Sequence, residues 1–94
     1  MSHIRRFKDR LKAELKDLQF KQAFDEEEVL SSVAIQIAKI REAQGLSQKE
    51  LARRLHTSQQ TISRLENTDN KSYSLTTLIK LAQTFHKGLQ VRFV

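Results

Sequence analysis

The stretch that decides the fold is residues 47–66, SQKELARRLHTSQQTISRLE. Its apolar residues recur at steps of three and four, which is the period of an amphipathic helix, and they fall into two short runs. The first run is Leu51, Ala52 and Leu55, and the second is Ile62 and Leu65. Ala52 is small at a point where two crossing helices would need a close approach. The spacing therefore predicts two short helices joined by a tight turn.

Serine residues mark where these helices should begin. Ser47 and Glu50 form an S-x-x-E capping box, in which the serine hydroxyl accepts a hydrogen bond from an unpaired amide of the first turn. Ser58 is placed to cap the second helix in the same way. The two caps mark the start of each predicted helix.

The exposed side of the second helix is polar and carries no acidic residue before Glu66. A merely solvated helix usually mixes Lys with Glu, whereas amide, hydroxyl and guanidinium groups can bond base edges in the major groove. We therefore predict a helix-turn-helix that reads DNA, and the alternative is an ordinary helical hairpin. The candidate base contacts are Gln59, Gln60, Thr61, Ser63 and Arg64.

The composition fits a small helical protein that works inside the cell. Ninety-four residues make one domain, and the absence of proline with only two glycines favours helices. Without cysteine, disulfides and Cys-based zinc sites are excluded, and a reducing cytoplasm is the expected location. No apolar run is long enough for a bilayer and no signal peptide is visible, so we expect no membrane partner.

The net charge of +6 is unevenly distributed. Residues 1–24 carry seven basic and three acidic side chains, and residues 25–46 carry two basic and five acidic ones. Residues 47–94 carry eight basic and three acidic side chains. The half that contains the predicted DNA reader is thus positive, as a phosphate partner requires.

Residues 1–24 are expected to form an amphipathic helix ahead of the DNA-binding domain. Its apolar stripe supports three readings: it binds in a groove of a protein partner, packs on the body of its own domain, or rests on an anionic membrane surface. We favour the protein partner. The stripe consists of Ile4, Phe7, Leu11, Leu15 and Leu18.

Residues 25–88 are expected to form the helix-turn-helix domain. An acidic run at residues 25–28 suits the first turn of a helix that ends at Gly45. Ser74 should cap a last helix that ends at Lys87–Gly88. The inward residues expected are Leu30, Val33, Ala34, Ile35, Ile37 and Ile40 in the first of these helices, and Leu75, Leu78, Leu81 and Ala82 in the last, with Ile79 and Phe85 at its flanks.

Residues 89–94 read as a short strand, because Leu89, Val91 and Phe93 alternate with polar residues. A lone strand leaves its backbone groups unpaired, so we expect it to pair with the same strand of a second subunit. The alternative is a tail that packs on its own body. Together these elements predict an all-α five-helix bundle with a C-terminal strand that pairs across a dimer.

The sequence contains no pattern typical of a catalytic site. The three histidines, His3, His56 and His86, lie far apart without ligand-like spacing, and no glycine loop suited to phosphates is present. We therefore expect a binding protein without enzyme activity, metal or cofactor.

The segment IREAQGLSQKELARRLHTSQQTISRLEN, residues 40–67, resembles the phage-repressor (Cro/cI, or XRE) class of helix-turn-helix domains over roughly residues 33–85. The resemblance implies a helical bundle that binds operator DNA as a homodimer, with Gln59, Gln60, Ser63 and Arg64 facing bases and Gln48 and Asn67 on phosphates. His56 stands where the class often has glycine in the turn, which implies a modest stability cost. The phosphate contacts expected in all are Gln48, Lys49, Thr57, Asn67, Lys71 and Ser72.

The two ends of the chain resemble HigA-type antitoxins. The N-terminal helix, the acidic run and the ending LAQTFHKGLQVRFV, residues 81–94, are similar to that group. The resemblance implies a RelE/HigB-like ribonuclease toxin as a protein partner and repression of the chain's own operon. The alternative is a stand-alone repressor without a toxin.

Glu66 is an acidic residue next to the predicted DNA-binding face. We expect it to have a structural role, in which its carboxylate bonds the backbone, Arg53 or Arg54.

Overall fold

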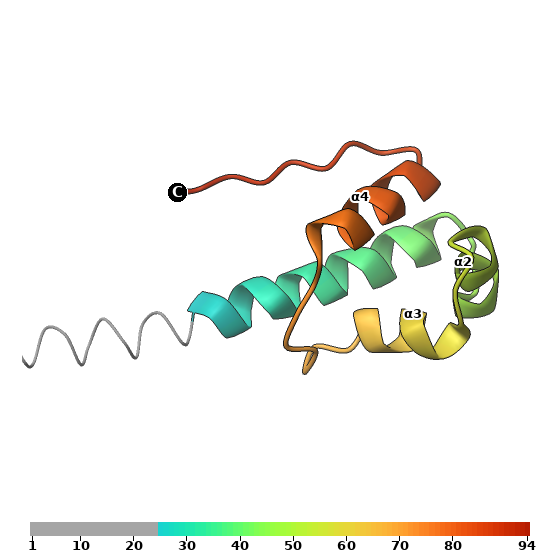
Figure 1. Ribbon diagram of the computed structural model, residues 1–94, viewed down its shortest axis with the longest axis horizontal. Helices are drawn as coiled ribbons and strands as arrows, with labels where there is room; N and C mark the ends of the chain where they lie inside the picture. The colour runs from blue at the N-terminus through green and yellow to red at the C-terminus, as the bar shows by residue number, and fades with distance from the viewer. Residues whose placement is uncertain (1–24) are drawn as a thin grey trace, which may run out of the picture.

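The computed structural model describes residues 25–94, and helices make up most of this range. A long helix over residues 25–43 leads into three shorter ones: α2 (Gln48–Arg54), α3 (Gln59–Leu65) and α4 (Leu75–Thr84). Figure 1 shows α2 and α3 at one end of the long helix, with α4 beside it. The fold of the described residues is thus all-α with four helices. The fifth helix of the expected bundle, in residues 1–24, lies outside the described residues.

Each short helix begins at the serine that the sequence predicts. The Oγ of Ser47, Ser58 and Ser74 accepts a hydrogen bond from the amide three residues later, at 3.0, 3.1 and 3.0 Å respectively. Each hydroxyl thereby satisfies one amide that has no partner within its helix. The three N-terminal boundaries are therefore encoded locally.

Three of the helices end in the same Schellman motif, which needs a residue in the left-handed conformation. That residue is Gly45 after the long helix, His56 after α2 and His86 after α4, with φ of 69°, 57° and 57°. In each case the next amide donates back to a carbonyl five residues earlier, for example Thr57 to Ala52 at 2.9 Å. His56 thus takes the left-handed conformation that glycine adopts most easily. The predicted end of α4 at Lys87–Gly88 is wrong, because His86 already makes the turn.

The core lies where the four helices meet. Ala52 is almost completely buried at the α2–α3 contact, as its small size predicts. Gln44 ties the end of the long helix to α4, since its Nε2 donates to the Phe85 carbonyl at 2.8 Å. The central cluster of buried residues is Ile37, Leu51, Ala52, Ile62, Leu65, Leu81 and Phe85.

Three predictions about inward residues are wrong. Ile35 on the long helix and Leu75 on α4 are exposed, whereas Phe85, expected at a flank, is buried. The core direction of α4 is set by Leu78, Leu81 and Phe85, so that residues 75 and 79 turn to the side. A helix can bury only part of its apolar surface when few elements pack against it.

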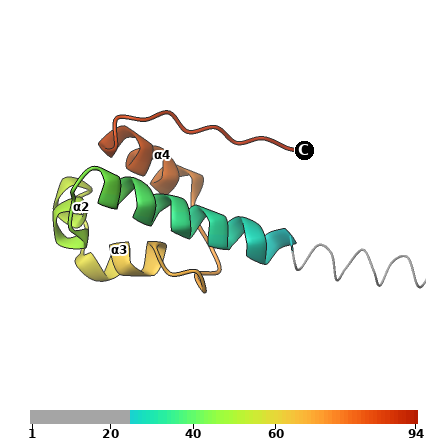
Figure 2. The same cartoon turned by 180° about the vertical axis from the view of Figure 1, so that it is seen from behind.

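The predicted C-terminal strand does not form in the described chain. After the turn at His86 the chain runs back in extended form to Val94 without strand pairing (Figures 1 and 2). A strand exists only through hydrogen bonds to a neighbouring strand, and residues 25–94 contain no such neighbour. The side chains of residues 89–94 are exposed.

Candidate nucleic-acid interface

The surface of α3 separates sharply into a buried and an exposed side. Ile62 is fully buried and Leu65 nearly so, which anchors the helix against the core. At 100° per residue, Gln60, Ser63 and Arg64 lie opposite these anchors, and all three are exposed. The candidate base-reading side chains therefore share one outward face of a helix whose rotation is set by its core.

Two further candidates flank this face. Gln59 is exposed at the start of α3. Thr61 is half-buried, and its hydroxyl lies 2.9 Å from that of Ser58, within the cap of the helix. Of the five candidate base contacts, Thr61 is thus the one with its polar group already bonded inside the protein.

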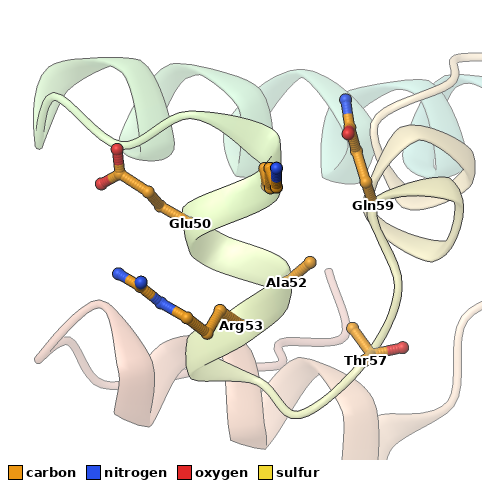
Figure 3. Close-up of a pocket in the computed structure, with 6 residues that line it drawn as sticks. Glu50, Ala52, Arg53, Thr57 and Gln59 are labelled. Atoms are coloured by element: carbon orange, nitrogen blue, oxygen red, sulfur yellow. The ribbon is translucent and has the colours of Figure 1, made fainter.

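A surface hollow lies between α2 and the start of α3. Figure 3 shows Ala52 between Glu50 and Arg53 on one side and Thr57 and Gln59 on the other. Lys49 completes the lining, so two predicted phosphate contacts, Lys49 and Thr57, meet a predicted base contact here. Arg53 adds a cation that the sequence reasoning did not assign to DNA. Arg53 is four residues after Lys49 on the same helix, and this spacing already indicated that the two cations share one side of α2.

A network of charged and polar side chains joins the long helix to the end of α3. The Arg41 guanidinium donates to both carboxylate oxygens of Glu66, with Nε–Oε2 at 2.6 Å and Nη2–Oε1 at 3.0 Å. Arg41 Nη1 also donates to the Leu46 carbonyl at 2.8 Å. Glu66 in turn accepts from Gln48 Nε2 at 3.2 Å. A single carboxylate therefore links the long helix, α2 and α3.

This ion pair is shielded from water, since the side chains of Arg41 and Glu66 are only 12% and 7% exposed. The hydrogen bond to Glu66 raises the pKa of Arg41 above its usual value, while burial acts in the opposite direction. The structural role predicted for Glu66 holds, but the predicted partners Arg53 and Arg54 are wrong. The actual partner, Arg41, lies 25 residues earlier in the chain.

A family model described as helix-turn-helix matches residues 37–91, more than half of the chain. The chain belongs to the XRE-type helix-turn-helix family. The match covers both helices of the motif, the loop after them and α4. The protein is accordingly a DNA-binding transcriptional regulator.

Comparison with curated proteins and with solved structures gave no match. Within residues 25–94, none of the helices has the length and hydropathy needed to cross a membrane. The same part of the chain brings together no group of three side chains able to hold a metal ion.

In this XRE-type domain the loop between α3 and α4 is held by short polar contacts. Tyr73 donates its hydroxyl to the Leu65 carbonyl at 2.6 Å, which closes the end of α3. Asn67 Oδ1 accepts a hydrogen bond from the Asp69 amide at 2.8 Å. The side-chain NH₂ group of Asn67 makes no hydrogen bond within residues 25–94. Lys71 and Ser72 are exposed on the same loop.

The predicted site residues thus fall into groups. The candidate base contacts gather on α3, and the candidate phosphate contacts come from the starts of α2 and α3 and from the α3–α4 loop. The predicted dimerisation residues Leu89, Val91 and Phe93 lie apart from both, in the C-terminal tail. The predicted partner-binding stripe in residues 1–24 lies outside the described residues.

Proposed function

We propose that this XRE-type regulator is a repressor that acts in the cytoplasm and binds a palindromic operator as a homodimer. The observation that carries the proposal is the outward face of α3, where Gln60, Ser63 and Arg64 are exposed opposite the buried Ile62 and Leu65. Two such helices related by a two-fold axis would enter successive major grooves about 34 Å apart. A site with two inverted half-sites fits that arrangement.

Gln60 is the best candidate for reading a base. Its amide both donates and accepts, which matches the N6 and N7 edge of adenine in the major groove. Arg64 suits guanine O6 and N7 or a phosphate oxygen, and Gln59 and Ser63 extend the same face. Lys49, Thr57, Asn67, Lys71 and Ser72 would fix the register on phosphates, together with Gln48.

A Gln60→Ala variant tests base reading once an operator has been selected from random DNA. We expect operator binding to weaken by about 1–3 kcal/mol, while binding to random DNA stays nearly unchanged. The measurement is a titration of both DNAs at one fixed salt concentration. Gln36→Ala, which truncates an exposed glutamine of the long helix, is the matched control and should leave both affinities intact. An equal loss on both DNAs for Gln60→Ala would refute the base-reading role.

We further propose that the repressor serves as an antitoxin, neutralising a RelE/HigB-like ribonuclease and repressing its own operon. What supports this role is the apolar stripe of residues 1–24 in the sequence, which a partner groove would cover, and the resemblance of both chain ends to HigA-type antitoxins. The proposal includes no enzyme activity of the chain itself and no cofactor.

The competing function is a stand-alone repressor without a toxin, which the helix-turn-helix supports equally well. The adjacent open reading frame separates the two, because only an antitoxin needs a small basic ribonuclease-like neighbour. Expression with that neighbour, with and without residues 1–24, should give a complex that requires the segment. A neighbour that copurifies equally well with both forms would contradict the assigned role of residues 1–24.

A further inference from the structure

Six of the large apolar residues exposed in the described part lie on α4 and the C-terminal tail: Leu75, Ile79, Leu89, Val91, Phe93 and Val94. Phe93 is completely exposed and Val91 is 63% exposed. Leu89, Leu75 and Ile79 are each exposed by 40% or more. Leaving this much apolar surface in water is unfavourable.

These residues form two surfaces with regular geometry. Leu75 and Ile79 are four residues apart, so they share one side of α4. In the tail, Leu89, Val91 and Phe93 alternate with Gln90 and Arg92, so the three apolar side chains point to one side of an extended chain. No backbone hydrogen bond within residues 25–94 involves residues 88–94. The tail therefore offers both an apolar side and a free backbone edge.

We propose that a second copy of this chain covers both surfaces. The two tails pair as an antiparallel ribbon centred on Val91, and the apolar face of that ribbon lies on Leu75 and Ile79 of α4. The inference rests on the proposed function, because it supplies the dimer that a palindromic operator needs. It names the surface and the register of that dimer.

The apolar pattern of the tail selects this register. When Val91 lies opposite Val91 of the second copy, Leu89 lies opposite Phe93, and the six side chains of Leu89, Val91 and Phe93 in the two copies fall on one face. Gln90 then lies opposite Arg92 on the other face. A slip of one residue would mix apolar and polar side chains on both faces, and a slip of two residues would leave only two apolar pairs opposite each other instead of three. The two-fold axis of the dimer passes through the centre of the ribbon.

The exposed apolar area supplies more than half of what a stable dimer buries. If a large side chain in the open exposes about 150 Å², the low end of the range for aromatic side chains, the exposed fractions of Leu75, Ile79, Leu89, Val91 and Phe93 amount to roughly 450 Å² per copy. Stable interfaces bury about 800 Å² per partner, and the tail backbone with Gln90 adds to the apolar part. None of the five residues lies on α2 or α3, so the dimer leaves the DNA-reading face open.

A single introduced cysteine tests the ribbon, because the natural chain has none. Val91→Cys should form a covalent dimer on mild oxidation at micromolar concentration without DNA, since opposite residues of an antiparallel pair have Cα atoms about 4.5–5.5 Å apart, within disulfide range. Leu89→Cys is the matched control. In the proposed register its two copies are separated by about 13 Å along the strands, and it should stay largely uncrosslinked. Equal crosslinking of both variants, or none with Val91→Cys, would overturn the register.

The α4 surface is tested by two substitutions at isoleucines of nearly equal exposure. Ile79 is 42% exposed and Ile35 is 43% exposed. The hydroxyl of Ser31 bonds the Thr68 carbonyl in the loop after α3, so this side of the long helix faces that loop. Ile35, four positions later, lies on the same side and therefore faces away from α4. Ile79→Glu should raise the dimer dissociation constant at least tenfold in sedimentation equilibrium, and Ile35→Glu should leave it unchanged. Thermal melts followed by circular dichroism check that both variants fold.

A tail that folds back on its own α4 would give a wild-type monomer at every concentration, and this result would overturn the proposal. An Ile79→Glu variant that dimerises like the wild type would overturn the docking on α4. These measurements use no DNA, so their failure is distinct from failure of the operator proposal. A crosslinked dimer that selects no DNA sequence would leave this surface standing and remove the proposed repressor function.

Discussion

Helix α3 and the C-terminal tail both present an outward surface, but they present opposite kinds. In α3 the apolar Ile62 and Leu65 are buried and the polar side chains face out, whereas in the tail the apolar Val91 and Phe93 face out. The apolar side chains of α3 are buried by other helices of the same chain, whereas those of Val91 and Phe93 remain exposed. The orientation of α3 is therefore a property of one chain, while that of the tail depends on what covers it.

The hydrogen bonds of the two regions explain this difference. Ser58 closes the start of α3, Tyr73 bonds the carbonyl at its end, and Glu66 just beyond it binds Arg41. Within residues 25–94, the backbone hydrogen bonds that hold the tail are those of the turn at His86, where it leaves α4. Substitutions at the supports of α3 should thus cost folding stability, and substitutions in the tail should not.

Removing the support from Glu66 should have the largest effect. Arg41→Ala leaves the carboxylate of Glu66, which is 7% exposed, without its cation, and we expect the free energy of unfolding to fall by about 1.5–3 kcal/mol. Urea denaturation measures the change. Glu42→Ala removes the exposed second partner of Arg41, 3.6 Å away, and should cost less than about 1 kcal/mol. Equal losses for the two variants would show that the buried pair does not hold α3.

Opening the end of α3 should have a smaller effect. Tyr73→Phe keeps the ring but removes the 2.6 Å hydrogen bond to the Leu65 carbonyl, and should destabilise the fold by about 1–2 kcal/mol. Hydrogen exchange should show faster exchange in the last turn of α3 than in α4. An unchanged exchange pattern would mean that the loop is held by packing alone.

The turn between α2 and α3 should gain stability from glycine. His56→Gly removes the strain of a side chain at φ 57°. Glycine also raises the entropy of the unfolded chain, which offsets part of this effect, so we expect the free energy of unfolding to rise by up to about 1 kcal/mol. Gly45→Ala is the reciprocal control, because nothing lies within 4 Å of an added Cβ and only its φ of 69° opposes the change. It should destabilise by about 1 kcal/mol. Thermal unfolding measures both, and a loss of stability in His56→Gly would show that the imidazole has contacts worth more than the strain.

The smallest effect is expected in the tail. Val91→Ser combined with Phe93→Ser should change the unfolding free energy of the monomer by less than about 0.5 kcal/mol, since both residues are exposed. The measurement is made at a protein concentration low enough to keep the chain monomeric. A loss of several kcal/mol there would place the tail in the core of a single chain and erase the contrast with α3.

Features that depend on neighbouring residues could be predicted from the sequence. The serine caps and the two helices of the motif follow from patterns within a few residues, as does the outward face of α3. The partner of Glu66 could not be found in this way, because Arg41 becomes its neighbour only through the packing of the long helix. For Leu75 and Ile35, the periodicity identified an apolar side of the helix but not how much of it the other helices cover. The alternation in residues 89–93 predicted a strand, but residues 25–94 supply no neighbouring strand for it to pair with, and the alternation alone does not reveal this.

The shortness of α2 and α3 has a consequence for how the protein responds to heat. Each has seven residues, and isolated helices below about 12–15 residues are marginal in water. The DNA-reading helix therefore persists only while the shared core is intact, and no partly unfolded form should keep it. Warming should therefore remove DNA binding at the temperature at which the domain melts, so that the amount of bound DNA would report the folded fraction.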